Sequence, residues 1–170
     1  MDLTKALLKE HSKAQMTKIV DYVGQNDARF KVLVEVYLAG PYRVTQRAAW
    51  PLSYCVERYP GLVKPHLKRL LDFLDKPGIH DAVKRNTLRL LQYTELPKRL
   101  HGRVADLCFQ YLQSKGESIA VKAFSLTVLQ RIVELEPELG AELKIIIEDQ
   151  LPYASPAFRS RAMKVLKVIG

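Results

Sequence analysis

The histidine, cysteine and acidic residues of this sequence show no spacing that would assemble a catalytic or metal-binding site. The four histidines stand singly, and none belongs to an HxH or HExxH motif. A zinc site needs three or four ligands that converge on one ion. The sequence also lacks a GxSxG motif and a glycine-rich phosphate loop. It therefore predicts no metal, no cofactor, no small-molecule ligand and no enzymatic activity.

The two cysteines give no sign of a disulfide. Cys55 and Cys108 lie far apart, have no CxxC spacing, and sit within apolar helical patterns. Such positions favour free, buried thiols over a disulfide, which is the weaker alternative. The chain also shows no apolar run of the roughly 18 residues that cross a membrane and no continuous apolar centre of a secretory signal. These features predict a cytoplasmic protein that does not bind membranes.

The pattern best suited to binding lies in residues 42–58. Five residues follow one another there at spacings of four, three, four and four, which places them on one stripe of a helix: Arg43, Arg47, Trp50, Tyr54 and Arg58. Arginines beside aromatic rings can bind phosphates, stack on bases or contact acidic peptides. The alternative is that Trp50 and Tyr54 pack against a neighbouring helix while the arginines only stay hydrated.

The charge of the chain is unevenly distributed. The net charge is +9, and residues 42–115 alone hold fourteen Lys and Arg against six Asp and Glu, a net +8. Residues 116–150 hold three basic against seven acidic side chains, a net −4. A polarised surface of this kind steers partners of opposite charge, which include acidic proteins as well as nucleic acids.

Helical periodicity runs through almost the whole chain, and Pro and Gly fall mainly between the periodic segments. The pattern predicts a leading helix over residues 3–23, followed by helices over about 26–39, 42–58, 61–74, 79–95, 98–113, 117–135, 137–150 and 156–169. The connections are short, which is typical of antiparallel neighbours packed side by side. No linker is long or polar enough to mark a domain boundary, so we expect one domain over residues 1–170.

An internal repeat organises these helices. Four segments align without gaps, VTQRAAWPLSYC, AVKRNTLRLLQY, AVKAFSLTVLQR and AFRSRAMKVLKV, beginning 38, 38 and 37 residues apart. Apolar residues recur in register, so we expect Leu52, Leu90, Leu91, Val128, Leu129, Val165 and Leu166 in the core. A period near 38 with two helices in each unit is typical of a helical solenoid. The predicted fold is an all-α, α-α superhelix (a right-handed solenoid) with repeats over about 26–58, 61–95, 98–135 and 137–169.

The segment PGLVKPHLKRLLDFLD followed by HDAVKRNTLRLL resembles a HEAT repeat and, more broadly, the armadillo class. In that family a first helix is followed by a turn with an aspartate and by a second helix with an arginine. Asp75 and Arg85 match these two positions, and the resemblance implies that they tie successive repeats together. It also implies about four HEAT-like helix pairs and a surface for partners.

The sequence thus predicts a non-catalytic module that binds a protein partner with an acidic surface through a basic face. The expected partner-binding residues are Arg43, Arg47, Trp50, Tyr54, Arg85 and Arg89. The alternative is a nucleic-acid-binding protein, distantly like the alkylpurine DNA glycosylases of the HEAT-like class, which the basic middle segment also suits.

Overall fold

The computed structural model describes residues 1–170, and every regular element in it is a helix, so the all-α prediction is confirmed. No helix is both long enough and apolar enough to cross a membrane. In chain order the elements are α1 (Leu3–Lys9), α2 (Lys13–Val23), α3 (Asp27–Ala39), α4 (Tyr42–Arg58), the 3-10 helix η1 (Pro60–His66), α5 (Leu67–Leu74), α6 (Asp81–Leu90), α7 (Lys98–Gln113), α8 (Ile119–Leu135), η2 (Pro137–Leu139), α9 (Gly140–Gln150), η3 (Leu151–Tyr153) and α10 (Pro156–Ile169).

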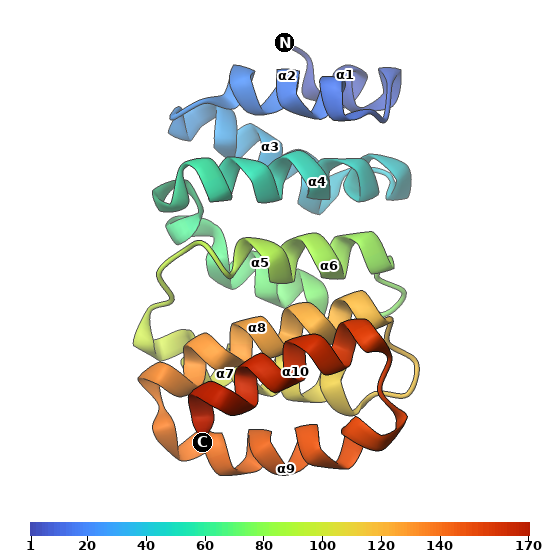
Figure 1. Cartoon of the computed structure of the whole chain (residues 1–170). Coiled ribbons are helices and arrows are strands. Elements are labelled where there is room, and N and C mark those ends of the chain that lie inside the picture. The colour runs from blue at the N-terminus through green and yellow to red at the C-terminus, as the bar shows by residue number, and fades with distance from the viewer. The chain divides into compact units, whose positions relative to one another are not determined.

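The helices form two compact units, residues 1–95 and residues 96–170. In the first unit α4 lies at the centre and packs on α2, α3 and α6. Figure 1 shows α2, α4 and α6 stacked in one layer, with α3 in a second layer behind them. Tyr37 of α3 crosses the core and its hydroxyl lies 2.7 Å from the Thr87 hydroxyl of α6. The prediction of a single domain over residues 1–170 stays a prediction.

The leading helix expected over residues 3–23 is wrong, because two helices occupy this stretch. Glu10 has an extended backbone, and the Ser12 hydroxyl accepts a hydrogen bond from the Gln15 amide at 3.1 Å. Serine is a favoured N-cap because its side chain replaces the missing backbone acceptor of the first turn. The run Lys9-Glu10-His11-Ser12 therefore ends α1 and starts α2. It contains no apolar residue that could pack on the core and keep one continuous helix in place.

Three other predicted helices are shorter than expected. The segment 61–74 divides into the 3-10 helix η1 and α5, because Pro65 has no backbone N–H to donate and excludes an α-helical bond there. The helix expected over 79–95 ends at Leu90, where a turn begins. The helix expected over 137–150 begins with the 3-10 turn η2 and continues as α9.

In the second unit α8 packs on α7 and α10, while α9 packs on α7 and α10. The repeat register correctly predicts its buried positions, since the side chains of Val128, Leu129 and Val165 are fully buried. The same holds in the first unit for Leu52, Leu90 and Leu91. Leu166 is the exception and is only half-buried, because α10 packs on α8 and α9 and leaves one side of the helix to solvent.

Candidate functional site

The predicted stripe is the solvent side of α4. Arg43 and Arg58 are exposed, and Arg47, Trp50 and Tyr54 are half-buried. The apolar residues of the helix lie on its other side, where Val44, Ala48, Leu52 and Cys55 are fully buried. Helix α6 lies next to α4 and contributes Arg85 and Arg89. We call the solvent side of α2, α4 and α6 the α4 face.

Arg47 is bound to the end of α1. Its Nη1 donates hydrogen bonds to the carbonyls of Leu7 at 3.0 Å and Leu8 at 3.1 Å, while Gln15 Nε2 donates to the carbonyl of Ala6 at 2.7 Å. The last carbonyls of a helix have no partner within the helix and need other donors. Because α1 stops at Lys9, Arg47 and Gln15 supply those donors. Arg47 therefore joins α4 to α1 within the structure.

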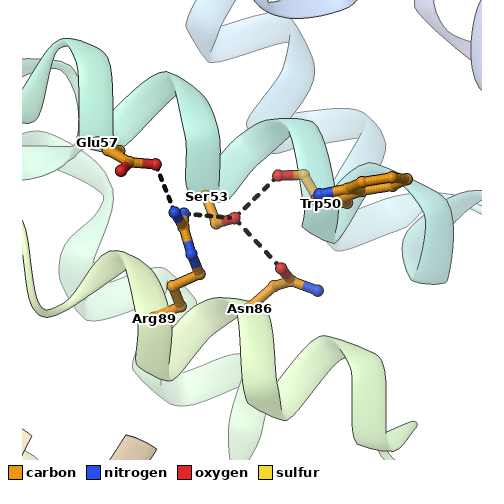
Figure 2. A network of polar contacts seen from close by, with 5 residues as sticks. All are labelled: Trp50, Ser53, Glu57, Asn86 and Arg89. Atoms are coloured by element: carbon orange, nitrogen blue, oxygen red, sulfur yellow. Dashed lines mark hydrogen bonds and ion pairs between the residues drawn. The ribbon is translucent and has the colours of Figure 1, made fainter. Parts of the chain in front are cut away.

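Arg89 lies at the junction of α4 and α6 and forms the centre of the polar network in Figure 2. One guanidinium nitrogen donates to the Glu57 carboxylate and the other donates to the Ser53 hydroxyl at 3.4 Å. The guanidinium also stacks over the Tyr54 ring at 4.2 Å and the Tyr93 ring at 5.1 Å. With 17% of its side chain exposed, Arg89 acts mainly as a clamp between the two helices.

Ser53 connects this network to the backbone of α4. Its hydroxyl lies 2.9 Å from the carbonyl of Trp50 and 3.2 Å from Oδ1 of Asn86, and its single proton goes to one of these two acceptors. The Trp50 ring points away from the network (Figure 2) and packs edge-on against the ring of His11, with centroids 5.4 Å apart. The Trp50 ring thus packs against His11 while part of its surface stays exposed, and the binding role of the stripe stays a prediction.

Two more arginines of the α4 face form ion pairs. Arg58 Nη1 lies 2.6 Å from Oδ1 of Asp21 on α2, and this hydrogen bond raises the pKa of Arg58. Arg85 Nε lies 2.7 Å from Oδ2 of Asp81, one turn earlier on α6. The family resemblance implies Asp75 as the partner of Arg85, whereas the ion pair that the structure gives for Arg85 is with Asp81.

Arg43 and Lys13 are two cations of the α4 face that remain available to a partner. Arg43, at the start of α4, and Lys13, at the start of α2, are both exposed and make no ion pair or side-chain hydrogen bond. Lys13 borders an open hollow of about 390 Å³ between α2 and α4. The hollow is lined by Lys13, Met16, Thr17, Val20, Tyr54, Glu57 and Arg58.

The contribution of α2 to this face was not predicted from the sequence. Lys13, Met16, Thr17 and Val20 recur at spacings of three, one and three, which is the signature of one side of a helix. Interpreting residues 3–23 as one continuous helix hid this signal, because the break at Ser12 sets which side of α2 faces α4. The hollow could have been predicted only with the correct start of α2.

No group of three or more His, Cys, Asp and Glu side chains converges as metal ligands would. The prediction of free, buried thiols is confirmed, since Cys55 and Cys108 are both fully buried and unpaired. Burial raises the pKa of each thiol to about 12, which keeps both cysteines protonated and unreactive at neutral pH.

Comparison with known proteins agrees with this architecture. The family model described as the HEAT repeat domain matches residues 3–169. No curated protein and no solved structure matches the chain. HEAT repeats are helical scaffolds that often serve protein interaction, and the family is typically non-catalytic. The match covers nearly the whole chain, and together with the paired helices it shows that this protein belongs to the HEAT repeat family.

Proposed function

We propose that the chain is a non-catalytic binding module that holds a protein partner with an acidic surface through the α4 face. The observation that carries this proposal is the hollow of about 390 Å³ between α2 and α4, with an apolar wall and cations at its edge. Met16, Val20 and Tyr54 supply the apolar wall, and Lys13 stands beside them without an ion pair. A concave apolar site with a few charged groups at its rim is typical of recognition surfaces.

The ion pairs of the α4 face favour a protein over a nucleic acid. Asp21, Glu57 and Asp81 lie among the arginines, and each pairs with one of them. A nucleic-acid backbone needs several uncompensated cations at regular intervals, because its affinity comes mainly from neutralised phosphates. A surface of mixed sign with aromatic rings suits a polypeptide that offers both carboxylates and apolar side chains.

The six partner-binding residues predicted from the sequence divide into two groups, one that would contact the partner and one that would support the surface. Arg43, Trp50 and Tyr54 would contact the partner directly, since Arg43 is exposed and both half-buried rings keep part of their surface exposed. Arg47, Arg85 and Arg89 would act by holding the helices in place and by adding positive potential, because each already has an internal partner. Lys13 joins the first group.

The experiment compares two double variants of equal charge change. Lys13→Glu with Arg43→Glu alters the α4 face, whereas Lys18→Glu with Lys31→Glu alters exposed lysines outside the hollow. The full chain serves as bait in lysate with and without nuclease treatment, and the captured partner is then purified for affinity measurements at several salt concentrations. We expect the first variant to bind roughly tenfold or more weakly and to lose most of the salt dependence, because the partner's carboxylates lose their counter-charges.

Either of two results would overturn the proposal. Equal affinity of the two double variants would place the binding surface elsewhere. Loss of capture after nuclease treatment would show that the bait recovers nucleic acid, which is the alternative function. Far-ultraviolet circular dichroism of both variants provides the control that the helices remain folded.

A further inference from the structure

A second hollow lies in the other unit of the chain. It has a volume of about 450 Å³ and opens where the end of α7, the start of α8, the end of α9 with η3, and the start of α10 come together. Its lining includes Leu112, Lys115, Ile119, Lys122, Tyr153 and Phe158. This volume falls within the range of roughly 300–1,000 Å³ that is typical of ligand pockets.

The lip of this hollow carries large apolar side chains that the fold leaves in water. The Tyr153 side chain is 92% exposed and Ile119 is 51% exposed, while Leu112 and Phe158 are buried at the floor. An exposed aromatic ring beside an apolar floor is typical of a surface that receives a partner side chain. The walls are fixed by two hydrogen bonds, from Gln150 Nε2 to the Leu112 carbonyl at 2.8 Å and from Arg159 Nη2 to the Leu151 carbonyl at 2.7 Å.

The charges around this hollow favour an anionic group. Lys115 and Lys122 line it and form no ion pair or side-chain hydrogen bond, whereas Asp149 is the single acid. Helices α8 and α10 begin at the hollow while α7 and α9 end there, so the partial charges of the four helix ends, positive at the starts and negative at the ends, largely cancel. The excess positive charge over the apolar floor therefore comes from the two lysines, which outnumber the one acid of the lining.

We propose that this hollow docks a short acidic segment of a protein partner, which inserts one apolar side chain between Ile119 and Tyr153 and sets carboxylates beside Lys115 and Lys122. The segment gains apolar burial on Phe158 and charge-assisted hydrogen bonds from the two lysines. This site shares no residue with the α4 face and lies in a different unit. A test that refutes this docking site would therefore leave the proposed function of the α4 face unaffected, and the reverse also holds.

The test uses short acetylated and amidated peptides and the full chain labelled with 15N. One probe peptide has a single phenylalanine flanked by glutamates, a second replaces the glutamates with lysines, and a third replaces the phenylalanine with alanine. We expect saturable amide shifts at Ile119, Lys122 and Phe158 with the first peptide, with a Kd on the order of 1 mM or tighter. The second and third peptides should each bind at least roughly tenfold more weakly, because one lacks the charge complement and the other lacks the apolar anchor.

Ile119→Asp is the variant that separates binding from folding. Position 119 is the first residue of α8, where an acidic side chain suits the helix dipole, so α8 should keep its start. The new carboxylate would stand in the hollow and repel the acidic peptide. Ile145→Asp is the matched control, because Ile145 is 61% exposed on α9 and does not line the hollow.

We expect Ile119→Asp to weaken the acidic phenylalanine peptide by roughly tenfold or more and Ile145→Asp to leave its affinity unchanged. Three results would overturn the proposal. They are the absence of saturable shifts around the hollow, equal binding of the lysine peptide, and unchanged affinity of Ile119→Asp.

Discussion

Replacing Arg89 with methionine tests whether this arginine is a clamp between α4 and α6. Methionine keeps the apolar stem but removes the guanidinium, with its bonds to Glu57 and Ser53 and its stacking on Tyr54 and Tyr93. The two stacked rings contribute about 0.5–1 kcal/mol each. Because the Glu57 side chain is 38% exposed and regains water when the pair is broken, the ion pair adds only about 1 kcal/mol.

The expected loss in free energy of unfolding is therefore about 2–3 kcal/mol, measured by urea denaturation of the full chain. A double-mutant cycle with Glu57→Gln isolates the ion pair, and its coupling energy should be about 0.5–1.5 kcal/mol. Arg43→Met is the control and should change stability by less than about 0.5 kcal/mol, since Arg43 is exposed and unpaired. A loss for Arg89→Met as small as that of the control would show that Arg89 is not a clamp and that its charge is available to partners.

Three further predictions concern the core, the end of the chain and pH. Leu129→Ala should cost roughly 2–5 kcal/mol in urea denaturation because Leu129 is fully buried, and a loss below about 1 kcal/mol would contradict the repeat register. Removal of residues 156–170 should cause aggregation or dimerisation in size-exclusion chromatography, because α10 covers α8 with Phe158, Ala162 and Val165; a monomeric truncation would refute this role. The hydrogen bond with His101 lowers the pKa of Glu136, so its contribution to stability is complete above pH 4.5 and is lost as the pH falls through the lowered pKa. Acid titrations of stability should accordingly be shallower for Glu136→Gln than for the natural chain, and parallel curves would contradict the pairing.

The fold was largely predictable because it depends on periodicity. The spacing of 38 residues places Leu52, Leu90 and Val128 at equivalent positions, and a buried leucine or valine at each is what stacking of helix pairs requires. The helix ends were less predictable. Ser12 stops one helix and starts another only because its hydroxyl reaches the Gln15 amide, and a serine within a helical pattern does not reveal that choice.

The arginines that α4 contributes to the α4 face were predictable, but the interactions of each arginine were not. The spacing of Arg43, Arg47 and Arg58 shows that they share one side of a helix. Whether each is free depends on partners far away in the sequence, such as the Leu7 carbonyl for Arg47 and Asp21 for Arg58. Such pairings depend on which residues the packing of helices brings together, and a single sequence does not state them.

The short helix α1 has a consequence for the behaviour of the N-terminus in solution. Seven residues do not form a stable helix alone, so α1 keeps its shape only while Leu3 and Leu7 stay docked on the core. Its amide protons should therefore exchange with solvent when this helix of about two turns undocks, well before the rest of the unit opens. Each undocking would also remove the Leu7 and Leu8 carbonyls that accept hydrogen bonds from Arg47. The docking of a seven-residue helix should therefore decide whether the Arg47 guanidinium is held by these carbonyls or is free to form other hydrogen bonds.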